Sequence, residues 1–370
     1  MNRFEKQILL EGFGITAQEK LLHAGVLVVG AGGLGCPVLQ YLAAAGVGTL
    51  GIADGDTVMI SNLNRQVLFG ENDVDKNKAA TAALQLTGQY RNMHVDVFPE
   101  WLNNQNIIPL IEKYDLIIDC TDNFAARYLI NDACMLMKKP WIFGAIYRNE
   151  GQVALFNPQD DNSVCYRDLN PELPETDTIP DCNQSGVLGV LPGIIGTMMA
   201  AEAIKWITGY GQTLQGKILL FNLLNYRWFN AEILPVPGSK KNIPRNRKEL
   251  LTRDYAVSCS PVPHFSWKEA LKRVENNPEK NLFVDVRNAD ENSLPDNFTC
   301  LQIPLPELKS RSSELAHADH LFLFCRSGIR SLEAAKILKK IYPTKNICNI
   351  EGGVLHAEAP FNRYYHESQA

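Results

Sequence analysis

Short apolar runs alternate with longer amphipathic segments over about the first 235 residues. The period-two and buried runs predict strands at residues 26–29, 48–53, 94–98 and 115–119. Between and after them, helical periodicity predicts helices at residues 34–45, 76–88 and 123–137. This alternation implies an α/β fold, a Rossmann-like doubly wound and mostly parallel sheet with helices on both faces. Residues 151–156 and 217–234 are predicted as later strands, for which an antiparallel arrangement is one option.

The pattern breaks twice before it resumes in a smaller form. Residues 157–185 are polar and proline-rich, and predict either a functional loop or a disordered one. A proline-rich stretch with a basic run that we expect to be solvated separates residues 1–237 from residues 263–370, so residues 238–262 are predicted as an interdomain linker. Beyond it, strands at residues 282–285, 320–324 and 346–350 and a helix at 331–341 predict a second, smaller α/β domain.

Composition excludes several classes of protein. A net charge of −5 argues against a nucleic-acid coat protein, and nine widely spaced cysteines argue against a disulfide scaffold. The uncharged stretches at residues 21–53 and 183–201 are interrupted by glycine and proline, so we expect them to be buried rather than to cross a membrane. We therefore expect a reduced, cytoplasmic protein without nucleic-acid or membrane partners, and the amino-terminal residues do not have the pattern of a secretory signal.

A glycine cluster follows the first strand and opens the first helix. Gly30, Gly32, Gly33 and Gly35 would let backbone N–H groups approach a phosphate at the positive end of that helix. Asp54 ends the next strand, where an acidic residue takes ribose hydroxyls. These features predict a nucleotide site, and on their own they fit an NAD-dependent oxidoreductase.

Further polar residues at the same predicted edge fit a triphosphate better. Arg65 lies in the loop of residues 61–66, and Lys78 opens a helix, so two cations are available for phosphates. Asp122 follows a buried strand, at the edge where open sheets bind ligands, and a carboxylate there can hold Mg²⁺. The alternatives are that Arg65 and Lys78 are surface charges and that Asp122 and Asn123 serve to cap a helix.

The order of these motifs resembles the MoeB/ThiF/HesA group, bacterial relatives of ubiquitin-activating enzymes. The motifs are GAGGLGCP, the aspartates at 54 and 56, SNLNRQ, the Lys78 helix, DCTDN and GVLGVLPG. The resemblance covers about residues 1–235 and implies ATP-dependent adenylation of the C-terminal glycine of a small ubiquitin-like protein. It implies nucleotide binding by the glycine loop, Asp54 and Ser61, phosphate binding by Asn62, Arg65 and Lys78, and Mg²⁺ binding by Asp122 next to Asn123. It also implies a homodimer in which an amino-terminal basic residue reaches the partner's ATP.

Two positions depart from that family pattern. The arginine expected to reach across the dimer is replaced by Lys6, and Arg3 is the other basic residue nearby. The first of two C-x-x-C pairs is reduced to Cys165-x-x-Asp168, and the second, expected near residues 233–238, is absent. One cysteine cannot build a tetrahedral thiolate site, so the sequence predicts no zinc.

Two cysteines are candidates for sulfur chemistry. Cys325 ends a predicted buried strand, and the following Arg326-Ser-Gly-Ile-Arg330 loop would stabilise a thiolate with N–H groups, a helix dipole and two arginines. With Asp285-Val-Arg287, this resembles a rhodanese domain over residues 263–368, although the segment after Asn288 and Ala357 depart from the usual pattern. By the resemblance of the first domain, Cys182 lies on a segment above the adenylate, where it either relays sulfur or only packs.

Together these features predict a fused adenylyltransferase and sulfurtransferase. A carrier glycine would be adenylated with ATP and Mg²⁺, and a Cys325 persulfide, with Arg330 beside it, would then give a thiocarboxylate. We expect a MoaD-type carrier ending in Gly-Gly, with a ThiS-type carrier as the alternative, and a sulfur donor such as a cysteine desulfurase. An NAD-binding oxidoreductase and a non-catalytic nucleotide-binding adaptor remain open as other classes.

Overall fold

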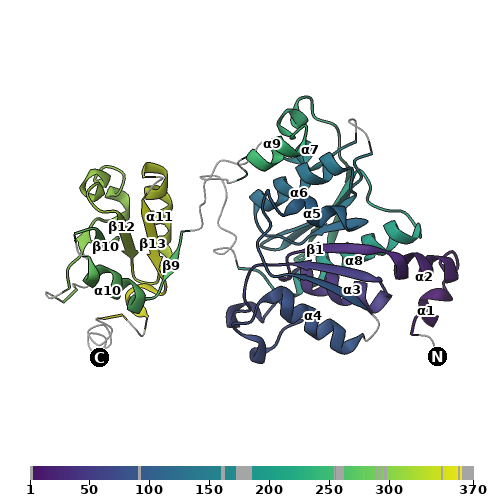
Figure 1. The fold of residues 1–370 in the computed structure, drawn as a ribbon, viewed down its shortest axis with the longest axis horizontal. Helices are drawn as coiled ribbons and strands as arrows, with labels where there is room; N and C mark the ends of the chain where they lie inside the picture. Colours follow the sequence, from purple (N-terminus) through teal and green to yellow (C-terminus); the bar gives the residue numbers. More distant parts are fainter. Residues whose placement is uncertain are drawn as a thin grey trace. The chain divides into compact units, whose positions relative to one another are not determined.

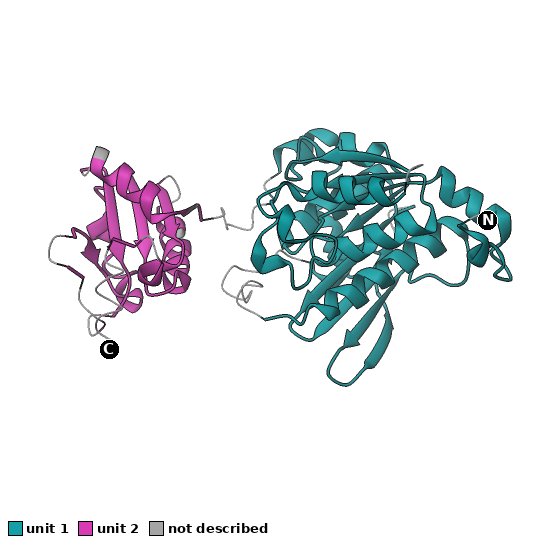
Figure 2. Ribbon diagram, turned by 90° about the horizontal axis from the view of Figure 1, so that it is seen from below, with its two compact units in different colours: residues 1–257 teal, residues 258–370 magenta. Residues whose placement is uncertain are grey.

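The protein is described from a computed structural model (Figure 1). The structure describes residues 3–90, 93–159, 163–171, 186–253, 255, 262–277, 279–288, 291, 294–295, 298–342, 345–356 and 359–360. The chain forms two compact units, Met1–Val257 and Ser258–Ala370 (Figure 2).

Unit 1 is built on an eight-stranded sheet in the order β3-β2-β1-β4-β5-β6-β7-β8. The strands are β1 (Gly25–Val29), β2 (Thr49–Ala53), β3 (His94–Phe98), β4 (Leu116–Asp119), β5 (Trp141–Tyr147), β6 (Glu150–Phe156), β7 (Lys217–Asn222) and β8 (Arg227–Glu232). The first five are parallel to one another and the last three join antiparallel. The predicted mostly parallel sheet is confirmed, and residues 217–234 form two strands because a turn divides them.

Helices cover both faces of this sheet (Figure 1). One face carries α2 (Gly14–His23), α3 (Gly35–Ala45), α4 (Lys78–Gln89) and α8 (Val190–Thr208), and the other carries α5 (Ile107–Glu112) and α6 (Phe124–Met137). The inner strands are apolar on both sides, since Val26 and Val28 of β1 enter the first core while Leu27 and Val29 enter the second. Shorter helices are α1 (Glu5–Ile8), η1 (Ile60–Asn62), η2 (Glu71–Asp73) and α7 (Tyr166–Leu169).

Helix α8 is the one helix among the described residues that is long and apolar enough to cross a membrane. Its mean hydropathy over the best window is 1.3. In the structure it packs against α3 and against strands β5 and β6, with Ile195 and Met199 buried in the core. Packing inside unit 1 therefore accounts for part of its apolar composition, since 44% of that window is buried.

The predicted linker at residues 238–262 is wrong in its first part. Residues there form η3 (Ser239–Asn242) and α9 (Arg247–Thr252), and α9 lies against α6. Leu250 is fully buried and the Tyr255 hydroxyl bonds to Asp132, so this segment belongs to unit 1. The sequence analysis missed α9 because the helix is short and has few buried positions, and because proline and basic residues surround it.

Unit 2 is a five-stranded, wholly parallel sheet in the order β11-β10-β12-β13-β9. Its strands are β9 (His264–Phe265), β10 (Asn281–Asp285), β11 (Leu301–Gln302), β12 (His320–Phe324) and β13 (Asn346–Ile350). Its helices are α10 (Trp267–Asn276), η4 (Leu305–Glu307), η5 (Ser312–Leu315), α11 (Ile329–Ile341) and η6 (Gly353–Leu355). The prediction of a second, smaller α/β domain is confirmed.

Candidate active sites

The glycine loop turns tightly from β1 into α3. Gly30 has a positive φ of 95°, and a Cβ atom there would lie 2.8 Å from the carbonyl oxygen of Cys120. A Cβ atom at Gly35 would lie 2.0 Å from the carbonyl oxygen of Gly30. These two positions require glycine, because the loop, β4 and α3 approach one another too closely for a side chain. Gly32 has more room, with only Gln66 within 4 Å of such an atom.

Asp54 ties this loop to the end of β2. Its carboxylate accepts hydrogen bonds from the N–H groups of Ala31 at 2.7 Å and Asp56 at 2.9 Å. Burial raises the pKa of Asp54, while these hydrogen bonds and the Lys78 ammonium oppose the shift. The structure therefore places Asp54 directly beside the glycine loop.

Lys78 is buried at the same edge. Asn77 caps α4 by accepting from the Ala80 N–H, so the helix begins at Lys78 as its motif predicts, and the first two residues of the predicted range 76–88 lie before it. The Lys78 ammonium pairs with the Asp56 carboxylate. The alternative in which Lys78 is a surface charge is wrong, because its side chain is only 7% exposed.

The loop of residues 61–66 packs on the glycine loop and on the start of α8. A Cβ atom at Gly33 would lie 3.2 Å from Pro192 and 3.5 Å from Arg65, and one at Gly189 would lie 2.0 Å from the carbonyl oxygen of Asn64. The Arg65 guanidinium donates to the carbonyl oxygen of Ser61 at 3.1 Å and to the Asn64 side chain at 3.0 Å. Three motifs far apart in sequence therefore meet at one place.

Two buried amides in this loop have polar atoms without partners in the structure. They are Oδ1 of Asn62 and Oε1 of Gln66. Orphaned buried acceptors are rare in folded proteins and often mark a ligand site. Gln66 was not among the predicted site residues, although it ends the SNLNRQ motif and its Nε2 is the group nearest Gly32.

The end of β4 contributes acidic groups. Burial raises the pKa of Asp119 to about 6, and its Oδ2 has no partner in the structure. Asp122 is exposed, while the Asn123 side chain caps α6 through the Ala126 N–H at 2.9 Å. The exposed oxygen ligands of Asp122 fit Mg²⁺, which keeps several waters and needs few carboxylates. The buried Arg127 beside Asp119 is a further polar residue that the sequence analysis missed.

Hydrogen bonds hold the corner around Cys165 and Asp168, the position of the reduced C-x-x-C pair. The Asp168 carboxylate accepts from the N–H groups of Cys165 and Val236, both at 2.9 Å, and from the Ser239 hydroxyl at 2.7 Å. Burial raises the pKa of the Cys165 thiol to about 12, so it stays protonated at neutral pH. This donor set does not fit a thiolate zinc site. The described residues contain no group of three or more His, Cys, Asp or Glu side chains arranged for a metal ion.

A buried ion pair lies next to this corner. Arg167 of α7 donates to both oxygens of Asp132 of α6, at 2.7 and 2.8 Å. The Tyr255 hydroxyl and the Asn131 side chain each donate to the same carboxylate at 2.9 Å. Both charged groups are almost fully buried, so the pair joins three segments inside the core.

The two amino-terminal basic residues differ in their surroundings. The Arg3 guanidinium donates to the carbonyl oxygen of Ala43 at 3.1 Å and lies over the rings of Phe4 and Tyr90. Lys6 is exposed on α1. Arg3 therefore makes contacts within its own chain, although both residues are exposed.

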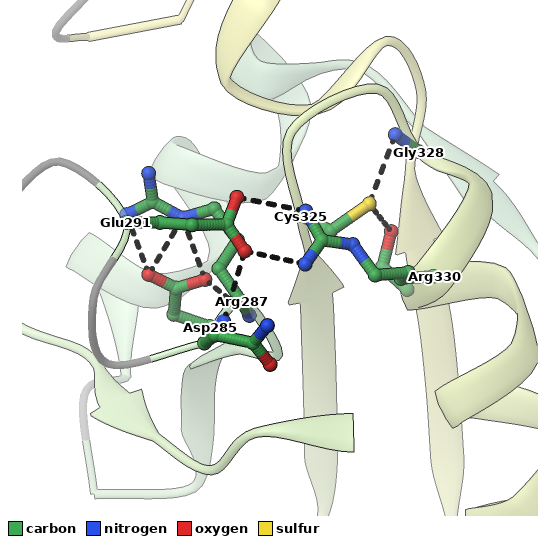
Figure 3. Close-up of polar contacts among 8 residues, drawn as sticks. Asp285, Arg287, Glu291, Cys325, Gly328 and Arg330 are labelled. Atoms are coloured by element: carbon green, nitrogen blue, oxygen red, sulfur yellow. Dashed lines mark hydrogen bonds and ion pairs between the residues drawn. The ribbon is translucent and has the colours of Figure 1, made fainter. Parts of the chain in front are cut away.

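In unit 2, Cys325 follows β12 and lies under the loop that leads into α11. Its Sγ accepts hydrogen bonds from the Gly328 N–H at 3.2 Å and the Ser331 hydroxyl at 3.4 Å (Figure 3). A second loop packs on it, since a Cβ atom at Gly353 would lie 2.2 Å from the Cys325 carbonyl oxygen. The loop therefore aims two hydrogen-bond donors at the sulfur, at the start of α11.

Two ion pairs line the same loop (Figure 3). Arg330 donates to Glu291 through its two terminal guanidinium nitrogens, and these hydrogen bonds lower the pKa of Glu291 to about 2. Arg287 pairs with Asp285 at the end of β10. The structure thus adds Glu291 to the predicted site, because it holds Arg330 near Cys325. Cys182, the other predicted sulfur residue, lies outside the described residues.

Comparisons with known proteins agree with this geometry. The ThiF family matches residues 4–241, and the rhodanese-like domain matches residues 266–356. A Thermus thermophilus protein named sulfur carrier protein adenylyltransferase is 45% identical over 267 residues, which cover 70% of this chain and 96% of that protein. A Mycobacterium tuberculosis protein named probable adenylyltransferase/sulfurtransferase MoeZ is 36% identical over 366 residues, which cover 95% of this chain and 91% of that protein.

Among solved structures, E. coli MccB with MccA-N7isoASN is similar, with a TM-score of 0.58 and 21% identity over 66% of this chain and 74% of that chain. At that identity the likeness concerns the fold alone, and it confirms the Rossmann-like core of unit 1. The two family matches confirm the resemblances seen in the sequence of each unit. The chain therefore belongs to the ThiF family, as an enzyme that joins an adenylyltransferase unit to a rhodanese-like sulfurtransferase unit.

Proposed function

We propose that this enzyme adenylates the C-terminal glycine of a small ubiquitin-like sulfur carrier and then converts that carboxylate to a thiocarboxylate. The observation that carries the proposal is the presence in one chain of two sites. One is a nucleotide-binding edge with Arg65 and Lys78, and the other is a separate loop that surrounds the Cys325 thiol with donors. The names of the Thermus and Mycobacterium relatives support both halves of the reaction.

In the first half-reaction, a carboxylate oxygen of the carrier's last glycine attacks the α-phosphorus of ATP. The bond from that phosphorus to the bridging oxygen breaks, and pyrophosphate leaves. Arg65 and Lys78 offset the charge on the phosphates, so Lys78 must exchange Asp56 for a phosphate oxygen. Mg²⁺, when bound at Asp122, supplies further charge neutralisation for the phosphates. The fixed loops orient the reactants, and no protein nucleophile is required.

In the second half-reaction, the terminal sulfur of a Cys325 persulfide attacks the acyl carbon and AMP leaves. The acyl disulfide then formed is cleaved by a second thiol. This releases the thiocarboxylate and leaves a disulfide that a cellular thiol reductant reopens. A sulfur donor such as a cysteine desulfurase reloads Cys325.

We propose a MoaD-type subunit of molybdopterin synthase as the carrier, because the fusion of these two units is characteristic of that role. A ThiS-type carrier of thiamin biosynthesis is the second candidate. We further propose a cytoplasmic homodimer, in which Lys6 reaches the partner's ATP.

The test is to mix the enzyme with ATP, Mg²⁺, thiosulfate and either a MoaD-type or a ThiS-type carrier. We expect carrier-dependent ATP–pyrophosphate exchange, and the mass of the carrier should rise by the replacement of one oxygen by sulfur. Cys325→Ala should abolish the thiocarboxylate while leaving exchange intact. Exchange that does not depend on any such carrier, or stoichiometric binding of NAD in place of ATP, would contradict the proposal.

A further inference from the structure

Trp101 is an exposed aromatic side chain at the edge of the nucleotide site. It follows β3 and is 65% exposed, and no motif in the sequence contains it. A Cβ atom at Gly55 would lie 2.7 Å from the Trp101 backbone nitrogen and 2.8 Å from two atoms of the indole ring. The indole therefore lies directly on the backbone of Gly55, between Asp54 and Asp56.

The segment that carries this indole is held in place. The Trp101 carbonyl oxygen accepts hydrogen bonds from the side chains of Asn106 at 2.9 Å and Asn103 at 3.2 Å. The next residue, Leu102, packs against the core of the α5 and α6 face. The backbone of this segment is fixed and the indole lies against Gly55, so a ligand that stacks on the ring orders little of the chain.

The strand order relates this indole to the parts of a nucleotide. Phosphates belong at the glycine loop after β1, and the ribose belongs at Asp54 after β2. Because the order is β3-β2-β1, the segment after β3 lies on the far side of the ribose from the phosphates. The N–H of Asp54 also donates to the carbonyl oxygen of Phe98, the last residue of β3, at 3.1 Å.

We propose that Trp101 is the platform on which the adenine of ATP stacks, with Gly55 kept small so that the indole can lie there. The inference rests on the proposed function, since it assigns the base subsite of the adenylation site. Stacking on an indole does not depend on the hydrogen-bonding groups of the base. Trp101 should therefore increase the affinity for a nucleotide without selecting adenine over other bases.

The test compares Trp101→Ala and Trp101→Phe with Trp228→Phe, which changes another exposed tryptophan, on β8. Binding of ATP and of tripolyphosphate is measured by calorimetry, and ATP binding also by tryptophan fluorescence. We expect Trp101→Ala to weaken ATP binding about tenfold or more and Trp101→Phe to weaken it less. Tripolyphosphate, which has no base, should bind all variants equally. ATP should quench the fluorescence of wild type and Trp228→Phe but not of Trp101→Phe.

In ATP–pyrophosphate exchange, Trp101→Ala should raise the KM for ATP and leave both kcat and the KM for the carrier unchanged. A folded Trp101→Ala enzyme, judged by its circular dichroism, that binds ATP like wild type would overturn the inference and leave the proposed function intact. A raised KM for the carrier in place of ATP would also overturn it, because Trp101 would then face the protein substrate. Failure of the wild-type enzyme to bind ATP would instead refute the proposed function.

Discussion

The buried carboxylate of Asp132 stabilises unit 1, and its neutralisation should be costly. Asp132→Asn keeps the size of the side chain but removes its charge. Two charge-assisted hydrogen bonds from Arg167 and one from Tyr255 depend on that carboxylate. The new amide nitrogen is a donor, so it would face donors and leave the Arg167 charge buried without its partner.

The expected loss follows from this geometry. Two hydrogen bonds to a charged group contribute about 1.5–3 kcal/mol each, which predicts a loss of about 3–6 kcal/mol. Removal of one partner of a buried ion pair in other proteins costs about 3–5 kcal/mol, in agreement with that figure. For a unit of this size, such a loss lowers the melting temperature by about 6–24 °C.

Scanning calorimetry of the full chain checks the prediction, with the transition of unit 1 expected to move and that of unit 2 to stay. The matched control is Glu112→Gln, which breaks an exposed ion pair with Arg247 in the same unit and should cost less than about 1 kcal/mol. The double variant Asp132→Leu, Arg167→Met should recover part of the stability, because it removes both charges. An Asp132→Asn protein that melts within about 2 °C of wild type would refute the reasoning.

Three further predictions concern the two sites. Lys6→Ala should lower ATP–pyrophosphate exchange about 100-fold, whereas Arg3→Ala should leave it nearly unchanged, and equal effects would contradict the assigned roles. Asp122→Ala should lower exchange about 100-fold and weaken its dependence on Mg²⁺ concentration, and an unchanged Mg²⁺ titration would exclude Asp122 as a ligand. Glu291→Gln should release Arg330, slow sulfur transfer from thiosulfate to cyanide, and reduce the stability of unit 2 by about 1–2 kcal/mol at pH 7. Because the pKa of Glu291 is lowered from 4.5 to about 2, its ionised form stabilises the fold above pH 4.5, and the difference between wild type and variant should disappear as the pH falls from 4.5 to 2.

The sequence predicted the sheets well because their strands are strongly patterned. The strands β3, β12 and β13 begin and end at the predicted residues, since apolar runs there are bounded by clear turn or polar segments. The glycine loop and the Lys78 helix were also found, because special backbone geometry restricts those positions to few residue types. Apolar periodicity and glycine positions are local signals, so they can be recognised in a single sequence.

The parts that sequence reasoning missed depend on contacts between distant residues. Asp132 meets Arg167 and Tyr255 across 35 and 123 positions, and no local pattern marks any of the three. No local pattern distinguishes Trp101 from other aromatic residues, because its position beside Gly55 follows only from the strand order. The segment around α9 looked like a linker for the same reason, since its partners lie on α6.

Because Cys325 is buried, its own Sγ and the outer sulfur of its persulfide differ in their access to other molecules. The residue is only 1% exposed, so a reagent that does not fit the loop around its sulfur, as a sulfur donor must, has little access to it. A persulfide adds one atom about 2 Å farther out, and that outer sulfur is the one that meets another molecule. The enzyme with a free Cys325 thiol should therefore resist chemical modification. The enzyme with a Cys325 persulfide should expose only the outer sulfur, which a sulfur donor can replace. Iodoacetamide should accordingly modify the loaded enzyme faster than the empty one, and reduction should then return an intact Cys325.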